Sequence, residues 1–108
     1  MSDQTPRVNA SYLGNFITQA VRIAGKVVQI QGNTATIDAS GTVLIQLDSD
    51  TNIKTVGNVV EVIGRVNADH SIKEFASSDF GPDVNMEAIE AVVQATHTYP
   101  QLFYDPKQ

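Results

Sequence analysis

Apolar and polar residues alternate with a period of two between Val21 and Phe80, and the pattern changes beyond residue 83. A period of two is typical of strands with one face in a core and the other in water. Turn-forming residues divide the region into five predicted strands, at 21–31, 34–39, 43–47, 58–67 and 71–80. Five short strands of this kind predict an all-β fold, a small five-stranded antiparallel barrel.

The first predicted strand changes its apolar phase part-way along. Val21 and Ile23 occupy one phase, whereas Val28 and Ile30 occupy the other. A phase change after a glycine within a strand, here Gly25, predicts a β-bulge or a sharp bend. We therefore expect Val28 and Ile30 to point inward beyond the bend, so that one long strand serves two parts of the barrel.

From Val84 to Tyr99 the apolar period becomes helical, which predicts one α-helix appended to the barrel. Asp83 or Asn85 can cap its start, and Pro100 ends it. Apolar residues cover about 220° of the helix wheel, roughly twice the arc of a helix that lies on one core. They form two neighbouring stripes, one of Val84, Ala88, Ala91, Val92, Ala95 and Tyr99 and the other of Met86, Ile89, Val93 and Thr96. Two apolar stripes predict two packing partners, namely the barrel and a second protein.

The remaining helix positions form a polar arc made of Glu87, Glu90, Gln94, His97 and Thr98. At the other end of the chain, Asn9 can cap a short helical lid over residues 10–17. The expected organisation is a flexible tail at 1–8, the barrel with its lid at 9–81, the helix at 82–100 and a second tail at 101–108.

Composition narrows the possible functions. At 108 residues the chain is one domain, and its lack of cysteine excludes disulfides and cysteine-ligated zinc. The net charge of −5 argues against a stand-alone binder of polyanions. No apolar run is long enough for a membrane span, and no signal peptide is visible.

The sequence contains no recognisable catalytic or cofactor-binding constellation. His70 follows Asp69 in a predicted turn, a pairing that we interpret as solvated surface. His97 lies near the C-terminal end of the helix, where an imidazolium is favourable for the helix dipole. No enzymatic activity, metal or cofactor is therefore expected.

A five-stranded barrel can instead bind single-stranded nucleic acid, by stacking bases on aromatic side chains beside a basic track. The second and third predicted strands, where stacking would occur, contain no aromatic residue, lysine or arginine. Arg22, Lys26 and Arg65 are the remaining candidate phosphate contacts, and we interpret them first as ordinary solvated positions.

Four segments carry a resemblance to a known family: Pro6–Ala10, Phe16–Ile17, Val60–Val66 and His97–Gln101. In their order and spacing, over about Arg7 to Pro106, the chain resembles the smallest subunit of replication protein A, the eukaryotic heterotrimeric single-stranded-DNA-binding complex. The resemblance implies an OB-fold barrel with a C-terminal helix that joins one helix from each larger subunit in a three-helix bundle. It also implies a role in DNA replication, repair and recombination in the nucleus, with single-stranded DNA bound mainly by the large and middle subunits.

On this hypothesis the chain is a trimerisation scaffold with little DNA affinity of its own. The candidate interface residues are Met86, Ile89, Val92, Val93, Thr96 and Tyr99. Either apolar stripe could face the partners, and the bulkier stripe containing Ile89 is favoured. Two alternatives stay open. One is an independent OB-fold module that binds single strands through Arg22, Lys26 and Arg65, and the other is the small subunit of the telomeric single-strand-binding complex.

Overall fold

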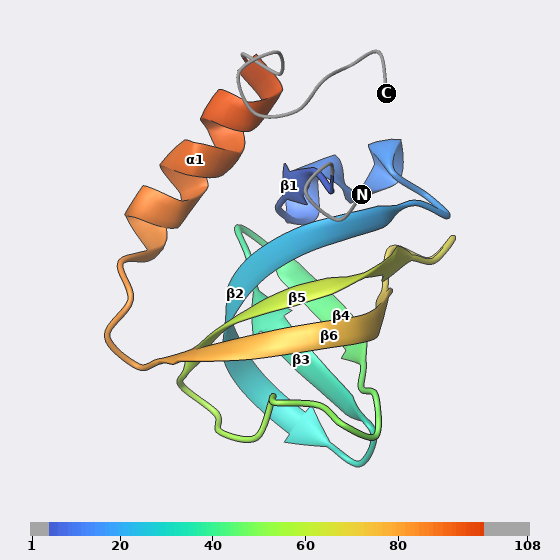
Figure 1. Ribbon diagram of the computed structural model, residues 1–108, viewed down its shortest axis with the longest axis vertical. Helices are drawn as coiled ribbons and strands as arrows, with labels where there is room; N and C mark the ends of the chain where they lie inside the picture. The colour runs from blue at the N-terminus through green and yellow to red at the C-terminus, as the bar shows by residue number, and fades with distance from the viewer. Residues whose placement is uncertain (1–4, 99–108) are drawn as a thin grey trace.

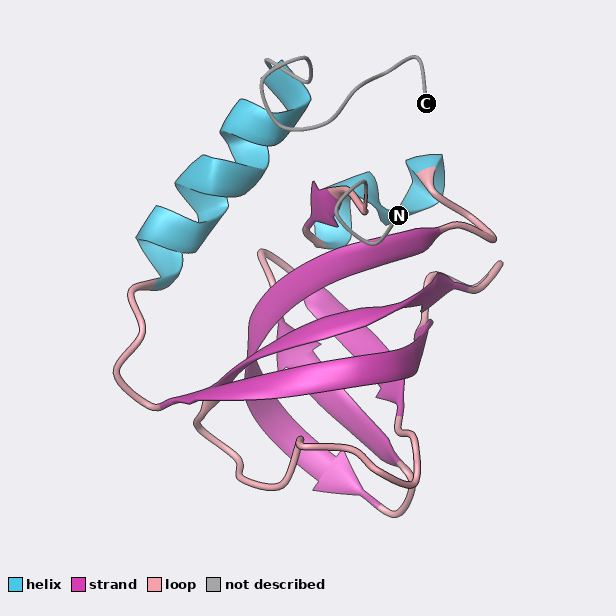
Figure 2. Cartoon of the chain, in the orientation of Figure 1, coloured by secondary structure: helices cyan, strands magenta, loops and turns pink. Residues whose placement is uncertain are grey.

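The computed structural model describes residues 5–98, as a barrel of strands with one helix standing beside it (Figures 1 and 2). In chain order the elements are β1 (Arg7–Val8), the 3-10 helix η2 (Ala10–Asn15), β2 (Ala20–Gln31), β3 (Thr34–Asp38), β4 (Thr42–Gln46), β5 (Val59–Val66), β6 (Ile72–Gly81) and α1 (Met86–Thr98). The five strands β2–β6 and α1 correspond to the predicted elements, with boundaries shifted by one or two residues at most ends.

The strands close into a ring because β2 pairs with two different neighbours. Its first half is antiparallel to β5 and its second half is antiparallel to β3. β3 pairs with β4, β4 with β6 and β6 with β5, which completes the circuit. The contact between β4 and β6 is short and parallel, with Ile45 opposite Ile72 and Gln46 opposite Lys73. The predicted five-stranded barrel is therefore present, with one parallel pair at its closure.

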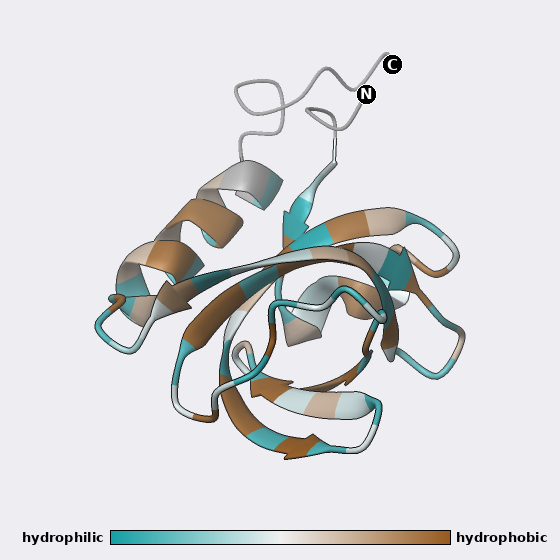
Figure 3. Ribbon diagram, turned by 60° about the horizontal axis from the view of Figure 1, so that its bottom comes forward, coloured by the Kyte–Doolittle hydropathy of each residue, from teal (hydrophilic) through white to brown (hydrophobic). Residues whose placement is uncertain are grey.

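Inward-facing residues of all five strands form a single apolar core. Brown and teal bands alternate along the strands, as the period-two pattern requires (Figure 3). The core consists of Val8, Leu13, Val21, Ile23, Val27, Ala35, Ile37, Ala39, Val43, Ile45, Ile53, Val60, Val62, Val66 and Ile72. Burial of these branched side chains supplies the main driving force for folding the barrel.

The bend in β2 lies three residues further along than the sequence indicates. The register between β2 and β3 shifts between Val27 and Gln29, so Val28 is the bulged residue. Val28 is 50% exposed, so the expectation that it points inward was wrong. Gly25 has another role, because a Cβ there would lie 2.8 Å from the carbonyl oxygen of Asp38 on β3. The glycine permits close approach of the two strands at the point where β2 turns from β5 to β3.

Arg7 and Val8, the last two residues of the tail expected at 1–8, form β1 and belong to the barrel. Arg7 and Val8 pair in parallel with Arg22 and Ile23 of β2. Val8 is only 1% exposed and belongs to the core, which explains why the barrel begins before Asn9. Asn9 caps η2 as predicted, since its Oδ1 accepts a hydrogen bond from the backbone N–H of Ser11 at 3.0 Å.

The helix α1 begins at Met86 and stands to one side of the barrel, on the side of β1 and η2 (Figure 1). Asn85 is its cap, because Asn85 Oδ1 accepts hydrogen bonds from the backbone N–H groups of Glu87 and Ala88. Of the two capping residues proposed from the sequence, the structure uses Asn85. Within residues 5–98, no helix has the length and apolarity that crossing a membrane requires.

Candidate assembly surface

One face of α1 lies against the barrel and is centred on Val93. Val93 is 3% exposed, and Met86 and Ile89 beside it are half-buried. These residues follow one another at intervals of three and four, so they form one stripe along the helix. This bulkier stripe, which was favoured for the partner interface, therefore packs on the chain's own barrel instead.

Polar side chains attach the same face of the helix to the lid. Asn9 Nδ2 donates a hydrogen bond to Glu90 Oε1 at 2.6 Å, and the Tyr12 hydroxyl donates to Gln94 Oε1 at 3.1 Å. Asn9 is 2% exposed; its side chain caps η2 and also donates a hydrogen bond to α1. The second carboxylate oxygen of Glu90 is buried without a hydrogen-bond partner in the described part of the chain.

His97 holds the C-terminal half of α1 in place. Its ring stacks on Tyr12, with centroids 3.9 Å apart and an angle of 7° between the planes, and meets Phe16 edge-on at 5.8 Å. His97 Nε2 lies 2.8 Å from the carbonyl oxygen of Arg7. Because a carbonyl only accepts, Nε2 carries the proton in this contact. The polar arc of the helix is thus partly used for docking, which the wheel alone did not indicate.

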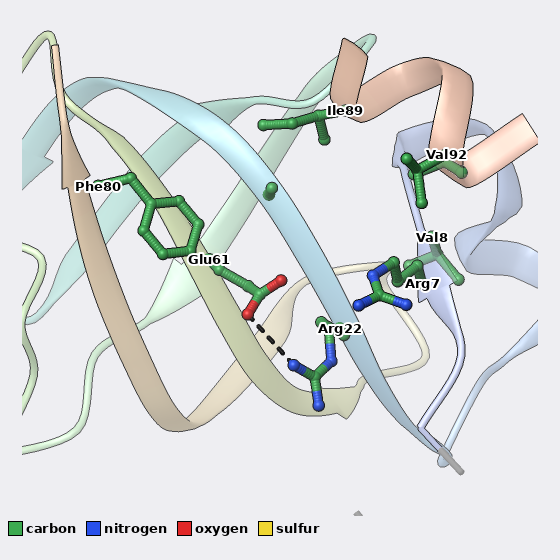
Figure 4. Close-up of a pocket in the computed structure, with 9 residues that line it drawn as sticks. Arg7, Val8, Arg22, Glu61, Phe80, Ile89 and Val92 are labelled. Carbon is green, nitrogen blue, oxygen red and sulfur yellow. Dashed lines mark hydrogen bonds and ion pairs between the residues drawn. The ribbon is translucent and has the colours of Figure 1, made fainter. Parts of the chain in front are cut away.

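A cavity of about 200 Å³ remains between α1 and the strands (Figure 4). Its helix side is formed by Ile89, Val92 and Val93. Its barrel side is formed by Arg7, Val8, Arg22, Ala24, Glu61 and Phe80. Arg22 Nη1 and Glu61 Oε1 form an ion pair at 3.3 Å beside it. The helix therefore spans the barrel surface without filling the space beneath it.

The opposite face of α1 is apolar and exposed. Ala88 and Ala91 are exposed and Ala95 is half-buried. We call these three residues the outer stripe. Val92 is 41% exposed and lies at the edge of this face, since it also lines the cavity beneath α1. The side chains of the outer stripe are small, so another helix could approach the backbone of α1 closely. The outer stripe belongs to the second of the two stripes that the sequence predicts.

The structure thus places the described members of the six predicted interface residues on the barrel side of α1 or at its edge. Met86, Ile89 and Val93 lie on the docking face, and Val92 lies between that face and the outer stripe, beside the cavity. Tyr99 and the side chain of Thr96 lie outside what the structure describes. Ala88 and Ala91 were recognised in the sequence as stripe members but were not selected, because the bulkier stripe containing Ile89 was favoured.

Lys26 is separated from the other two candidate phosphate contacts. Arg22 is paired with Glu61, and Arg65 is exposed on β5. Lys26 lines a different hollow, together with Asp38, Ser40, Met86, Glu87 and Glu90. Three carboxylates around Lys26 make that hollow unsuited to a phosphate. Among the described residues, no group of three or more histidine or acidic side chains could hold a metal ion.

Comparison with known proteins shows which family the chain belongs to. The family model for replication factor A protein 3 matches residues 1–103. Replication factor A protein 3 of Schizosaccharomyces pombe is 32% identical over 105 residues, which cover 97% of this chain and 100% of the relative. The chain belongs to the replication factor A protein 3 family. The resemblance seen in the sequence is confirmed.

Solved structures agree on the fold. A chain in the structure of U. maydis replication protein A bound to ssDNA superposes with a TM-score of 0.89 and 36% identity, over 97% of this chain and 100% of that chain. A chain of the S. pombe Stn1–Ten1 complex superposes with a TM-score of 0.73, over 92% of this chain and 97% of that chain. At 15% identity the second match shows the fold alone. The predicted OB-fold barrel with a C-terminal helix is confirmed for this family member.

Proposed function

We propose that the chain is the structural subunit of a heterotrimeric single-stranded-DNA-binding complex, assembled through α1. Membership of the replication factor A protein 3 family supports a place in such a complex. The observation that carries the proposal is the outer stripe, an apolar helix face directed away from the barrel. The partners are the large and middle subunits, each contributing one helix to a three-helix bundle.

The role is non-catalytic, and it belongs to DNA replication, repair and recombination in the nucleus. Most DNA affinity resides in the partners, because β3 and β4 offer no aromatic residue and no cation for stacking or phosphate contact. The similar U. maydis complex was solved bound to ssDNA, which supports the same ligand for the whole assembly.

The test compares the same substitution on two exposed alanines. Ala91→Asp places a carboxylate in the outer stripe, whereas Ala76→Asp places one on β6 of the barrel; both alanines are exposed. Burying an unpaired carboxylate at the centre of an interface should weaken assembly at least about 100-fold. Co-purification of the two larger subunits should therefore be lost with Ala91→Asp and kept with Ala76→Asp. Equal retention by both variants would refute the proposal.

The telomeric complex is the second candidate, because the fold also matches the Stn1–Ten1 structure. The two candidates differ in the proteins that co-purify with the intact chain. Recovery of the replication protein A subunits supports the first, and recovery of a telomeric partner would replace it.

A further inference from the structure

Four of the seven lysines and arginines gather on the outer surface of β1, β2, β5 and β6. Arg7 on β1 is opposite Arg22 on β2, which is opposite Ile63 on β5. One row further along, Arg65 on β5 is opposite Lys73 on β6. Residues that are directly opposite point to the same face of a sheet. Arg7, Arg22, Arg65 and Lys73 therefore form one continuous patch, which we call the basic strip.

The pairing of Arg65 with Lys73 is unfavourable for the barrel itself. Like charges directly opposite in an antiparallel pair destabilise the sheet. Both side chains are exposed, and within residues 5–98 neither has an ion pair or a side-chain hydrogen bond. Two like charges held opposite each other without a neutralising side chain lower the stability of the sheet. Unfavourable local arrangements of this kind are typical of functional sites.

Negative charge offsets the basic strip only in part, although Lys73 shares a hollow with Asp48 and the buried Glu74. Glu61 lies in the adjoining row and pairs with Arg22 at 3.3 Å. Asp69, in the turn that joins β5 to β6, accepts hydrogen bonds at its Oδ1 from the backbone N–H and the hydroxyl of Ser71. The strip remains positive in a chain whose net charge is −5. At its β1–β2 end, Arg7 and Arg22 lie at the edge of the cavity beneath α1 (Figure 4).

An exposed aromatic ring lies beside the cations. Phe75 is 49% exposed on β6, two residues from Lys73. The register of β5 and β6 shifts here, with Gly64 opposite Glu74 and Ile63 opposite Ala76, so Phe75 is a bulged residue without a partner in the ladder. A bulge re-aims a side chain outward. Cations in a row with an exposed ring are the two components of sequence-independent binding to single strands.

We propose that the basic strip and Phe75 form a contact surface for single-stranded nucleic acid, with phosphates on Arg7, Arg22, Arg65 and Lys73 and an unpaired base on the Phe75 ring. The four strands are about 5 Å apart, so the strip spans about 15 Å and accommodates a few nucleotides. Affinity through so few contacts is low for the isolated chain. In an assembled complex, tethering raises the effective concentration of the strand and makes a weak contact useful. The proposal goes beyond the assembly role and does not depend on it.

The test titrates the isolated, isotope-labelled full chain with a short oligothymidylate at several salt concentrations and follows amide shifts. Shifts should concentrate on β5 and β6, and log affinity should fall with log salt with a slope of about −2 to −3. Arg65→Ala and Lys73→Ala should each reduce the slope by about 0.7, whereas the control Lys26→Ala, at a position among carboxylates, should not. Phe75→Ala should weaken binding by about 5- to 150-fold without changing the slope.

A charge-swapped variant separates loss of binding from loss of folding. Lys73→Glu places opposite charges across the β5–β6 pair, so it should raise the melting temperature while weakening binding more than Lys73→Ala does. Absence of binding by the parent chain, shifts confined to β3 and β4, or a Lys73→Glu variant that binds as the parent does would each overturn the proposal. Polyglutamate that binds the strip as tightly as the oligonucleotide would assign it to an acidic protein partner instead, and would also overturn it.

Discussion

Fifteen buried apolar residues hold the barrel together, whereas Val93 is the one buried side chain among those described in α1. The remaining attachment of the helix is polar or aromatic, through Glu90, Gln94 and His97. A helix of 13 residues is marginal by itself in water. The difference indicates that the barrel is complete as it stands, while α1 is positioned on it and still exposes an apolar face that another chain can bury.

Shortening a side chain in the barrel core should have the largest effect on stability. Ile37 is fully buried on β3, and Ile37→Ala should lower the free energy of unfolding by about 2–5 kcal/mol, measured by urea titration of strand circular dichroism. Val28→Ala, at a 50% exposed position, is the matched control and should cost about 0.5 kcal/mol or less. Similar losses from both variants would contradict a single tightly packed barrel core.

Removing the buried contact of the helix should affect α1 and spare the barrel. Val93→Ala deletes apolar surface worth about 1–2 kcal/mol of docking energy. Amide exchange in α1 should therefore accelerate, while the urea midpoint of the barrel signal stays near that of the parent. A parallel fall in barrel stability would mean that helix and barrel unfold as one unit, and the comparison would fail.

A smaller change concerns the polar attachment. Tyr12→Phe removes the hydroxyl that donates to Gln94 but keeps the ring stacked on His97. Because the hydrogen bond is exposed, the expected loss of docking energy is about 0.5 kcal/mol, seen as slightly faster exchange in α1. Tyr12→Ala removes the stacking as well and should have the larger effect. If the two variants are equal, the ring contact contributes nothing.

Loss of folding stability at acid pH should come from carboxyl groups of the barrel. Hydrogen bonds from the Ser71 hydroxyl and backbone lower the pKa of Asp69, and hydrogen bonds from the Asn58 side chain and the Gly81 backbone lower the pKa of Asp79. A carboxyl whose pKa is lower in the folded state stabilises the protein above its unfolded pKa. That contribution is lost as the pH falls through the folded pKa, below the ordinary aspartate range. Ser71→Ala should flatten the acid limb of a plot of stability against pH, whereas an unchanged limb would exclude Asp69 as a contributor.

Much of the fold follows from periodicity. Alternation and the turn-forming residues between the apolar runs located all five barrel strands, although the fourth run is apolar on both faces. The change to a helical period located α1, because an element with one buried face has apolar residues at regular intervals. The bulge at Val28 was misplaced because Gly25 offered a stronger local signal than a valine. β1 was missed because a pair of residues, Arg7 and Val8, is too short to show a period.

The candidate site was only partly predictable. The helix wheel showed two apolar stripes but could not indicate which one packs on the barrel. Both stripes are apolar, and the choice depends on the barrel surface that each would contact. Asn9 and Tyr12, which hold Glu90 and Gln94, are some eighty residues away in the chain. The basic strip could not be predicted from the sequence for the same reason, since Arg65 and Lys73 become neighbours only through the register of β5 with β6.

Hydrogen exchange of the chain, alone and with its two partner subunits, tests the central claim most directly. In the isolated chain, amides of α1 should exchange through local opening at a much lower free energy than those of β2 and β5. Binding of the partners should raise the protection of α1 towards that of the barrel, and Ala91→Asp should prevent this increase. Barrel-like protection of α1 in the isolated chain, unchanged by the partners, would mean that the helix is complete without them and would contradict the account.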